Sequence, residues 1–495
     1  MINLHQIDSF VREKGAQAAV VHQGQSLSWL QLQAQTESYV TYLLNHYKAT
    51  LPRQVCYIAK NRLDLFPWLA AFATLSIPVV GLDYTLPLTT LQAMAKKINA
   101  DFILLSSSVL GLHDDLPAFG HSHFNGGKLF DLDAPSLAVI GAIGANMHPH
   151  AMPSARPFSS VGFTSGTSGI PKAVRRTRAF DPRRFRYFTE RYGFSAADRF
   201  MVSMPLYHAA GNGWARLFLS LGATLYLSDS CNTKEMAQIL DQHQISATVF
   251  SPVQLAGVLA HRGQGVLAPP PALRWVLVGG RNFTAVEKLH AQQVLGPVIY
   301  EYYGTTESGV NTIAEPIDLR DHPHSVGRAY DGNRIAIIST KGDELGQGEV
   351  GTVCIASYMN MDDYIDGGAT FVTLSDGERY FVTPDQGYLD ADGRLFLLNR
   401  AGDSGKHTPL YPLENALRSL PCIHDLAFLL EDGLIKCAFT THKASTDTHR
   451  LEQRIFQIAE SEKIRLIQCH RVEEIPYLPS GKVRIRDLEN ILAPQ

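Results

Sequence analysis

The sequence predicts an α/β protein with two helix-covered, mainly parallel sheets, a small β-barrel-like subdomain and a small α+β domain at the C-terminus. Three observations support this prediction. The chain has 495 residues, 45% of them apolar, which is enough for more than one hydrophobic core. Up to about residue 300, short apolar runs alternate with helix-like segments, as is typical of parallel sheets covered by helices. From about residue 325, strands and turns follow one another closely, which indicates antiparallel hairpins.

Short β-branched or apolar runs mark the strands expected in the two parallel sheets. Helix-like segments separate them, and parallel strands need a crossover of that kind between them. The runs are residues 17–22, 55–59, 77–82, 101–107, 199–205, 223–228, 247–251, 274–280 and 297–304. Because crevices at the carboxyl ends of parallel strands bind ligands in α/β sheets, we expect the functional site at these ends.

The most apolar window covers residues 65–82 and has almost the length of a membrane span. Pro67 and Pro78 interrupt this window, and it barely reaches the lower length limit for a spanning helix. We therefore expect a buried helix that continues into a strand, and no membrane span.

The C-terminal part of the sequence predicts two further structural regions. Turns at residues 341–343 and 346–348 indicate antiparallel hairpins in a small β-rich subdomain. Residues 398–409 are polar and rich in turn formers, and about 90 residues of mixed helix and strand character follow. We expect a hinge there. The predicted domains are residues 1–399 and residues 400–495.

Charge and cysteine usage narrow the class of protein. The 44 basic and 47 acidic residues give a formal net charge of -3, so we expect neither a nucleic acid nor an anionic membrane as partner. The six cysteines form no CxxC pair and are expected to be reduced thiols. The N-terminus carries Asp8, Arg12 and Glu13 before any apolar run, unlike a signal peptide. These features predict a cytoplasmic protein.

Residues 163–173 read FTSGTSGIPKA, a stretch rich in glycine, serine and threonine. Glycine lets the backbone approach a polyphosphate closely, and each N–H can donate to an anionic oxygen. A P-loop would need Gly-Lys-Ser/Thr, whereas Lys172 follows Pro171 and precedes Ala173. The match to a hydrolase nucleophile elbow is poor, because that motif needs a serine between its glycines and Gly162 and Gly166 flank a threonine. From this stretch alone, a flexible linker remains an alternative.

Several motifs, in the correct order along the chain, resemble the adenylate-forming superfamily, which includes acyl-CoA and aryl-CoA synthetases, peptide-synthetase adenylation domains and luciferases. The resemblance to its phosphate loop rests on Thr164, Ser165, Gly166, Thr167, Ser168, Gly169, Pro171 and Lys172. The resemblance to its adenine-binding motif rests on Glu301, Tyr302, Tyr303, Gly304, Thr305, Thr306 and Glu307. Tyr380 to Asp385 resemble its ribose-binding segment, Asn399-Arg400 the pair before its hinge, and residues 479–483 the loop carrying its catalytic lysine.

The resemblance implies ATP-dependent activation of a carboxylate, with roles that suit each side chain. Glu307 is a hard oxygen ligand for Mg2+, together with the Thr167 hydroxyl. Thr306 offers its hydroxyl to the α-phosphate. Lys482 contacts both the substrate carboxylate and the α-phosphate and so neutralises the two anions as they approach. In the family, rotation of the C-terminal domain then withdraws this lysine, which implies a mobile domain here.

The nucleotide itself is expected to contact a second set of residues. Tyr303 supplies an aromatic face for adenine, although core packing is the alternative for an isolated tyrosine. Asp385 accepts hydrogen bonds from the ribose hydroxyls, and Arg400 reaches ribose or phosphate oxygens. Gly280 belongs to the same site, as the family's Gly-Gly-Ala strand end approaches adenine.

The acyl side of the pocket is expected at residues 205–214, which resemble the segment through which substrates of the family enter. The pocket residues implied are His208, Gly211, Trp214, Gly279 and Arg281. His208 would close over the substrate carboxylate, with a hydrogen-bonded core histidine as the alternative. No acidic residue occurs at 204–220, so an amino-acid substrate is disfavoured, and small side chains leave room for an aryl or fatty acyl group.

Arg281 departs from the family's Gly-Gly-Ala pattern, and two interpretations remain open for it. It pairs with a polar group or a second carboxylate on the substrate, or it points outward into an ion pair. The hinge, residues 399–414, also departs from the pattern because it is short and lacks its usual glycine. Since that loop shapes the pantetheine tunnel in relatives that form thioesters, this departure argues against ordinary CoA ligation.

The resemblance predicts an acid–thiol ligase with ATP and Mg2+, and CoA or a phosphopantetheinyl carrier protein as acceptor. A basic cluster could dock the acidic carrier protein or the 3′-phosphate of CoA, with a solvated helix face as the alternative. Its members are Arg175, Arg176, Arg178, Arg183, Arg184 and Arg186. A noncatalytic AMP-binding protein is disfavoured because Glu307, Asp385 and Lys482 are all present.

Overall fold

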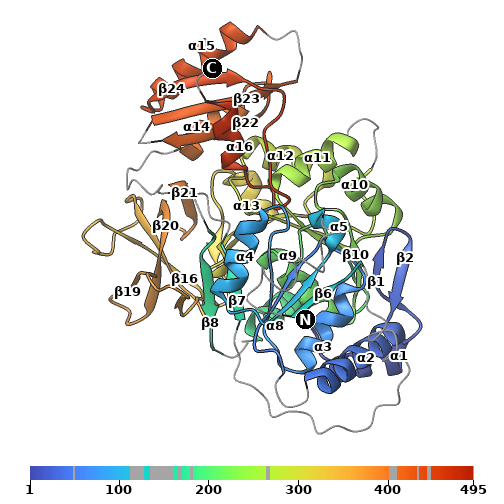
Figure 1. The fold of residues 1–495 in the computed structure, drawn as a ribbon. Coiled ribbons are helices and arrows are strands. Elements are labelled where there is room, and N and C mark those ends of the chain that lie inside the picture. The colour runs from blue at the N-terminus through green and yellow to red at the C-terminus, as the bar shows by residue number, and fades with distance from the viewer. Residues whose placement is uncertain are drawn as a thin grey trace. The chain divides into compact units, whose positions relative to one another are not determined.

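The computed structural model describes residues 1–47, 51–111, 128–133, 160–164, 170–178, 182–262, 268–400, 410–431, 434–442 and 447–493 (Figure 1). The chain divides into two compact units. The first unit comprises Met1–Val249, Pro270–Arg274 and Met361–Gly368. The second comprises Phe250–Pro269, Trp275–Asn360 and Ala369–Gln495. This division does not test the domain boundary predicted at residues 399 and 400, which stays a prediction.

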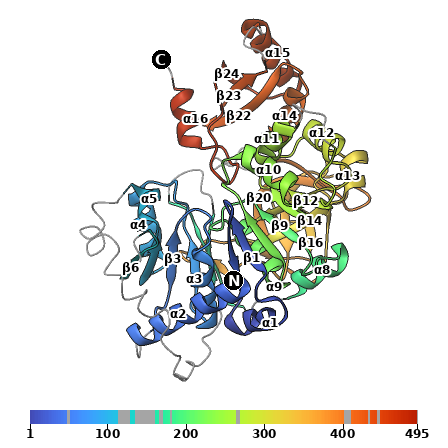
Figure 2. The same ribbon diagram turned by 90° about the vertical axis from the view of Figure 1, so that its right-hand side faces the viewer.

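The first unit contains a four-stranded parallel sheet (Figure 2). Its strands, in spatial order, are β4 (Val79–Gly81), β3 (Val55–Ile58), β5 (Phe102–Leu105) and β6 (Lys128–Asp131). Helices α1 (Leu4–Lys14), α2 (Trp29–Tyr47), α3 (Leu65–Thr74), α4 (Leu88–Lys97) and α5 (Ser107–Leu110) belong to the same unit. Trp68 of α3 packs on Phe102 and Phe130 with ring centroids 5.8 and 4.7 Å apart. The apolar window is thus a buried helix followed by β4, as predicted.

A second set of strands in the first unit includes three that follow the predicted phosphate loop in the sequence. Its strands, in spatial order, are β11 (Ala247–Phe250), β9 (Arg199–Val202), β10 (Thr224–Leu227), β1 (Ala18–His22) and β2 (Gln25–Ser28). They pair in parallel except in the β1–β2 hairpin. Helices α8 (Arg183–Tyr192), α9 (Ala209–Ser220) and α10 (Thr233–Gln242) belong to the same unit.

A small antiparallel sheet holds the two ends of the predicted phosphate loop. It consists of β7 (Ser160–Phe163), β8 (Ala173–Arg176) and β18 (Asp363–Tyr364). Phe163 pairs with Ala173, so the loop connects two neighbouring strands. The pairing of β8 with β18 joins residues far apart in the sequence, and local patterns did not predict it.

The second unit combines a mixed sheet with an antiparallel one. Strands β12 (Trp275–Val278) and β13 (Ile299–Thr305) are parallel, and β14 (Gly309–Ala314) and β15 (Arg328–Ala329) continue antiparallel. Helices α11 (Pro252–Arg262), α12 (Ala285–Leu295) and α13 (Pro316–Asp321) accompany them. The predicted β-rich subdomain is a five-stranded antiparallel sheet of β16 (Arg334–Ile338), β17 (Gly351–Ala356), β19 (Phe371–Thr373), β20 (Arg379–Leu389) and β21 (Leu395–Arg400).

The C-terminal residues form an α+β arrangement, as predicted. Strands β22 (Ile423–Glu431) and β23 (Leu434–Thr441) are antiparallel, and β24 (Leu466–Arg471) pairs in parallel with β23. Helices α14 (Leu410–Arg418), α15 (Thr448–Ser461) and α16 (Ile485–Ile491) belong to the same region. Leu413, Ile455 and Cys437 are part of its core. In the described part of the chain, no helix has the length and apolar character to cross a membrane.

Candidate functional site

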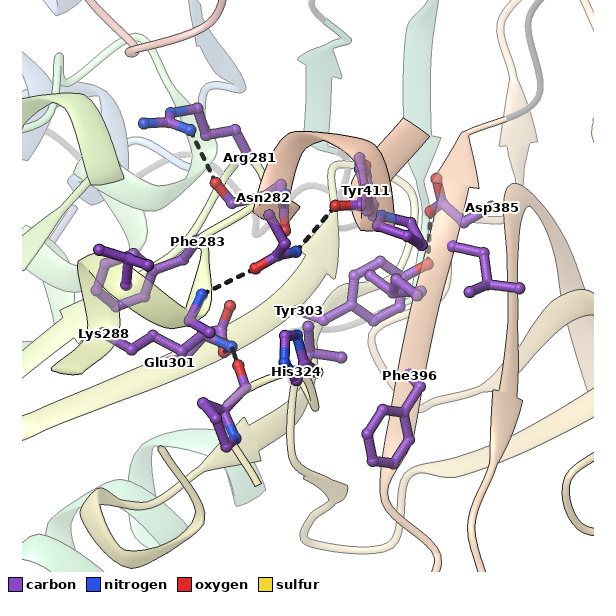
Figure 3. A pocket seen from close by; sticks show the side chains of 18 of the residues that line it. Arg281, Asn282, Phe283, Lys288, Glu301, Tyr303, His324, Asp385, Phe396 and Tyr411 are labelled. Atoms are coloured by element: carbon purple, nitrogen blue, oxygen red, sulfur yellow. Dashed lines mark hydrogen bonds and ion pairs between the residues drawn. The ribbon is translucent and has the colours of Figure 1, made fainter. Parts of the chain in front are cut away.

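A pocket of about 720 Å³ in the second unit collects residues of the predicted adenine-binding and ribose-binding motifs (Figure 3). It lies where β12 and β13 end. The predicted site residues that line it are Gly280, Arg281, Glu301, Tyr302, Tyr303, Gly304, Thr305 and Asp385. The folding of the second unit therefore brings the adenine-type and ribose-type motifs to one cavity, although they lie far apart in the sequence.

A buried hydrogen bond joins these two motifs. The Tyr303 hydroxyl donates to Asp385 Oδ2 over 2.6 Å, and Figure 3 shows the two side chains pointing toward one another. The Asp385 backbone N–H donates to Thr383 Oγ1 at 3.1 Å, and the Thr383 hydroxyl donates to the Val353 carbonyl at 2.8 Å. The carboxylate is thus held by the β17–β20 pair before any ligand binds.

Two consecutive glycines form the strand end on the other side of the pocket. A Cβ on Gly279 would lie 2.5 Å from the Tyr302 ring, so glycine is needed for this close approach. The Gly279 N–H donates to the Phe250 carbonyl at 3.2 Å. Gly280 has φ +98°, a conformation that favours glycine. The Gly-Gly pair therefore has a structural reason at both positions.

Glu301 forms a buried ion pair with Lys288 of α12 in the wall of this pocket. Lys288 Nζ lies 2.7 Å from Glu301 Oε2, and the two side chains are 2% and 3% exposed. The same ammonium donates to the Pro323 and Ser325 carbonyls. Burial raises the pKa of Glu301 to about 7, and the Lys288 charge opposes that shift. The sequence alone did not identify Lys288, because nothing local distinguishes it from a surface lysine.

Glu307 and Thr306 lie in the turn between β13 and β14. Glu307 is buried, and the turn is braced by a 2.9 Å hydrogen bond between the Thr305 and Ser308 hydroxyls. In the described part of the chain, no group of three or more His, Cys, Asp or Glu side chains is placed to hold a metal. A buried carboxylate that shares Mg2+ with substrate phosphates and water nevertheless fits how proteins usually bind this ion. Thr167 lies outside the described residues.

Lys482 lies in a tight turn of the second unit. The Leu478 N–H donates to the Lys482 carbonyl and the Gly481 N–H to the Leu478 carbonyl, both at 2.8 Å. Gly481 has φ +78°, and a Cβ there would meet Ser251 Oγ at 2.1 Å. Ser251 directly follows Phe250, the residue whose carbonyl receives the Gly279 N–H. The turn that carries Lys482 therefore packs against the strand end next to the Gly-Gly pair.

Arg281 is engaged by two carboxylates. Its guanidinium lies 2.8 Å from Glu287 and 3.3 Å from Glu414, and Asn282 Nδ2 donates to Glu414 at 2.9 Å. Of the two interpretations that the sequence left open, the ion pair is present, but the side chain is only 14% exposed and lines the pocket instead of pointing outward. Since Arg281 also lines the pocket, its assignment to the acyl site stays a prediction.

The remaining predicted residues belong to the first unit or fall outside the description. Thr164 and Lys172 close the base of the phosphate loop, since the Thr164 N–H donates to the Lys172 carbonyl at 3.0 Å. Lys172 Nζ lies 5.2 Å from the centre of the Tyr364 ring. The loop residues Ser165, Gly166, Thr167, Ser168 and Gly169 and the side chain of Arg400 lie outside what the structure describes.

His208 is the N-cap of α9, and its neighbours on this helix are also predicted pocket residues. His208 Nδ1 accepts a 3.3 Å hydrogen bond from the Ala210 N–H, so the ring proton is assigned to Nε2. A Cβ on Gly211 would lie 2.1 Å from the Pro205 carbonyl oxygen, and Trp214 is buried. The role of these three residues in binding the acid stays a prediction.

One member of the predicted basic cluster does not belong to an exposed surface. Arg175, Arg183 and Arg186 are exposed, whereas Arg184 is only 9% exposed. The prediction of one docking surface with six arginines is therefore wrong for Arg184, because the turn of α8 directs this side chain toward α9.

Solved structures share this combination of sheets with an α+β C-terminal region. The amide bond synthetase McbA from Marinactinospora thermotolerans has the same fold, with a TM-score of 0.79, 20% identity and 99% of each chain covered. O-succinylbenzoate coenzyme A synthetase from Bacillus subtilis, solved with AMP, gives a TM-score of 0.79 at 18% identity, covering 99% of this chain and 98% of that one.

Residues 7–365 match the family model of the AMP-binding enzymes. The chain belongs to this family, which confirms the resemblance and the prediction of an enzyme. Among curated proteins, it is 25% identical over 360 residues, 69% of each chain, to the fatty acid–[acyl-carrier-protein] ligase ScoC of Streptomyces coeruleorubidus. It is also 30% identical over 346 residues to the 2-succinylbenzoate–CoA ligase of Bacillus licheniformis, covering 66% of this chain and 68% of the relative.

Proposed function

We propose that the protein activates an aryl or fatty carboxylic acid with ATP, forming an acyl-AMP, and then transfers the acyl group to a thiol, with CoA as the first candidate acceptor. The Tyr303–Asp385 hydrogen bond carries this proposal, because it joins the adenine-binding and ribose-binding motifs in one pocket. The family match and the relatives named above support the same class of reaction.

In the first step, a carboxylate oxygen of the acid attacks the α-phosphorus of ATP. The bond to the β-phosphate breaks, and its electron pair leaves with pyrophosphate. Tyr303 offers its ring to adenine, Asp385 accepts from the ribose hydroxyls, and Thr306 donates to the α-phosphate. Lys482 neutralises the two approaching anions from a turn that Gly481 holds against Ser251.

Mg2+ fits this site through Glu307 and, as predicted from the sequence, Thr167. Such an ion neutralises the charge of the phosphates to which it binds. Glu307 is buried and offers a hard oxygen donor, and the described residues hold no complete metal cage, so the ion would share its coordination with substrate phosphates and water. Since His208 Nδ1 accepts from the Ala210 N–H, its Nε2–H would be the atom that donates to the carboxylate of the acid.

In the second step, the acceptor thiolate displaces AMP from the acyl carbon. A phosphopantetheinyl carrier protein is the alternative to CoA, and the exposed Arg183 and Arg186 would suit its acidic surface. ScoC, named as a carrier-protein ligase, supports this alternative. A cytoplasmic location suits a protein whose six cysteines are all free thiols.

Pyrophosphate release that depends on an added carboxylic acid tests the proposal. Aryl, short-chain, long-chain and amino acids are compared, with Lys482→Ala as a control expected to lose activity by about 100-fold or more. Acceptor trials with CoA and with a holo-carrier protein follow for the acid with the fastest turnover. No acid-dependent release across the whole panel would favour a noncatalytic AMP-binding protein.

A further inference from the structure

A buried arginine lies between the two helices that follow the phosphate loop in the first unit. Arg184, on α8, is 9% exposed. Its Cζ lies 5.1 Å from the centre of the Trp214 ring on α9. A Cβ placed on Gly213 would lie 3.7 Å from both terminal guanidinium nitrogens. The guanidinium therefore lies over the surface of α9, at a position that carries no side chain.

The charge of Arg184 has no acidic partner within the residues that the structure describes. Its described contacts are with the aromatic rings of Phe188 and Trp214. Glu190, the single acidic residue of α8, is exposed, and α9 has none. Removing an unpaired guanidinium from water costs several kcal/mol. A ligand that carries a negative charge would supply the missing partner.

A second arginine near this position makes an anion still more favourable. Burial lowers the pKa of Arg216 to about 10, and the positive charge of Arg184 contributes to that shift. Arg216 is still protonated at neutral pH, so two like charges lie close together between α8 and α9. Repulsion between these two charges disfavours the unliganded state. A bound anion would lower this repulsion.

The position of Arg184 relates it to the predicted acyl pocket. His208, Gly211 and Trp214 all lie on α9 or cap it, and Arg184 contacts the helix at residues 213 and 214. The five helical rises between His208 and Gly213 add up to about 7.5 Å along the helix axis. This is roughly the separation of the two carboxylates in an extended six-carbon diacid or a para-substituted benzoate.

We propose that Arg184 binds a second carboxylate at the far end of the acid substrate, so that the enzyme prefers diacids over acids with an apolar tail. The inference rests on the proposed function, since it places the activated carboxylate near His208. The planar guanidinium can bind the distal carboxylate through two parallel hydrogen bonds while it stacks on Trp214. A second anionic group was considered for Arg281, but Glu287 and Glu414 already neutralise that side chain.

Calorimetric binding of matched acids to the full chain without ATP tests the proposal. The probes are terephthalate and adipate, each compared with its monomethyl ester, which keeps the size and one carboxylate but removes the second charge. Wild-type protein is expected to bind at least one diacid about tenfold or more tightly than its ester. Arg184→Met should abolish this preference, and Arg184→Lys should keep part of it. Arg191→Met removes an exposed arginine of the same helix that lies outside the basic cluster and should leave the preference unchanged.

Thermal unfolding of the variants separates a binding role from a structural one. If Arg184 exists for a ligand, Arg184→Met removes an unpaired buried charge and the Tm of the unliganded protein stays equal or rises. A lowered Tm together with an unchanged diacid preference would overturn the proposal. Equal binding of diacid and ester by wild-type protein, or no diacid binding at millimolar concentration, would also overturn it. Because these measurements omit ATP, selective binding without pyrophosphate release would contradict the proposed function and leave this inference standing.

Discussion

Buried charged side chains have polar or charged partners in the pocket of the second unit, whereas the buried arginine between α8 and α9 of the first unit has no acidic partner among the described residues. In the pocket, Glu301 pairs with Lys288, and Asp385 accepts from Tyr303. Between α8 and α9, Arg184 is also buried but contacts aromatic rings instead of a carboxylate. The pocket is thus organised before its ligand arrives, which suits the nucleotide that all reactions of the family share. Between α8 and α9, a ligand would have to supply the negative charge that pairs with Arg184. Such a site suits the acid, which is the part of the substrate that varies.

The largest effect expected from this comparison concerns the Lys288–Glu301 pair. Lys288→Met removes the counter-ion of Glu301 and the donor to two carbonyls, so we expect a loss of about 3–5 kcal/mol in the free energy of unfolding at pH 8. Urea unfolding measures this loss. The double variant Lys288→Met/Glu301→Leu should recover much of it, since an apolar pair leaves no buried charge. If Lys288→Met were as stable as wild type, pairing would not stabilise the buried charge of the pocket. The proposed difference between the pocket and the α8–α9 helix pair would then be wrong.

The pH dependence of stability should report the raised pKa of Glu301. Between its ordinary value of 4.5 and about 7, the folded protein holds a proton on Glu301 that the unfolded chain has lost. The stability contributed by this proton is complete below pH 4.5 and is lost as the pH rises through 7. Its total is about 3 kcal/mol.

Glu301→Gln does not titrate, so its free energy of unfolding should fall less than that of wild type between pH 5 and pH 8. Urea midpoints and slopes measured across this range provide the comparison. Parallel curves for the two proteins would contradict a raised pKa for Glu301.

A smaller effect, confined to activity, is expected at the turn that carries Lys482. Gly481→Ala places a methyl group against Ser251 at a positive φ, so the turn must shift. A displacement of about 1 Å can lower the rate roughly 100-fold, and we expect pyrophosphate release to fall by about this factor. Gly377→Ala is the matched control, because Gly377 has the same φ of +78° but no atom within 4 Å of the added carbon. Equal effects of the two substitutions would show that backbone strain, and not the contact with Ser251, is responsible.

The smallest effect is expected from the hydrogen bond that joins the two nucleotide motifs. Tyr303→Phe keeps the ring for adenine but removes the donor to Asp385, and we expect the KM for ATP to rise about tenfold with little change in kcat. Tyr358→Phe removes a comparable hydroxyl–carboxylate bond, to Asp331 at 3.0 Å, and should leave the KM unchanged. A fall in kcat with unchanged KM would place the effect in the transition state instead.

Local patterns predicted most of the fold. All nine apolar runs form strands, and the turns at residues 341–343 and 346–348 join antiparallel partners. The sheet of β7, β8 and β18 was not foreseen, because Asp363 and Tyr364 pair with strands almost 200 residues earlier and carry no pattern of their own. Strand pairing at such a separation depends on the packing of the whole unit.

The residues of the candidate site likewise include some that the sequence could predict and one that it could not. Tyr303 and Asp385 could be predicted because each lies in a motif with a fixed spacing, and the structure brings them together. Lys288 could not be predicted, since its partner Glu301 lies in a separate element and only the packing of α12 against β13 makes them meet.

The sequence by itself determined the class of fold and the family, and it predicted which residues would contact ATP, because these follow from local periodicity and short motifs. Tertiary structure alone decided which charges are neutralised. Arg183, Arg184 and Arg186 are neighbours of the same type in the sequence, yet only Arg184 is buried. The sequence did not indicate that Glu287 and Glu414 would lie beside Arg281 and neutralise it. The physical reason is that burial and ion pairing depend on residues distant in the chain, which no local pattern records.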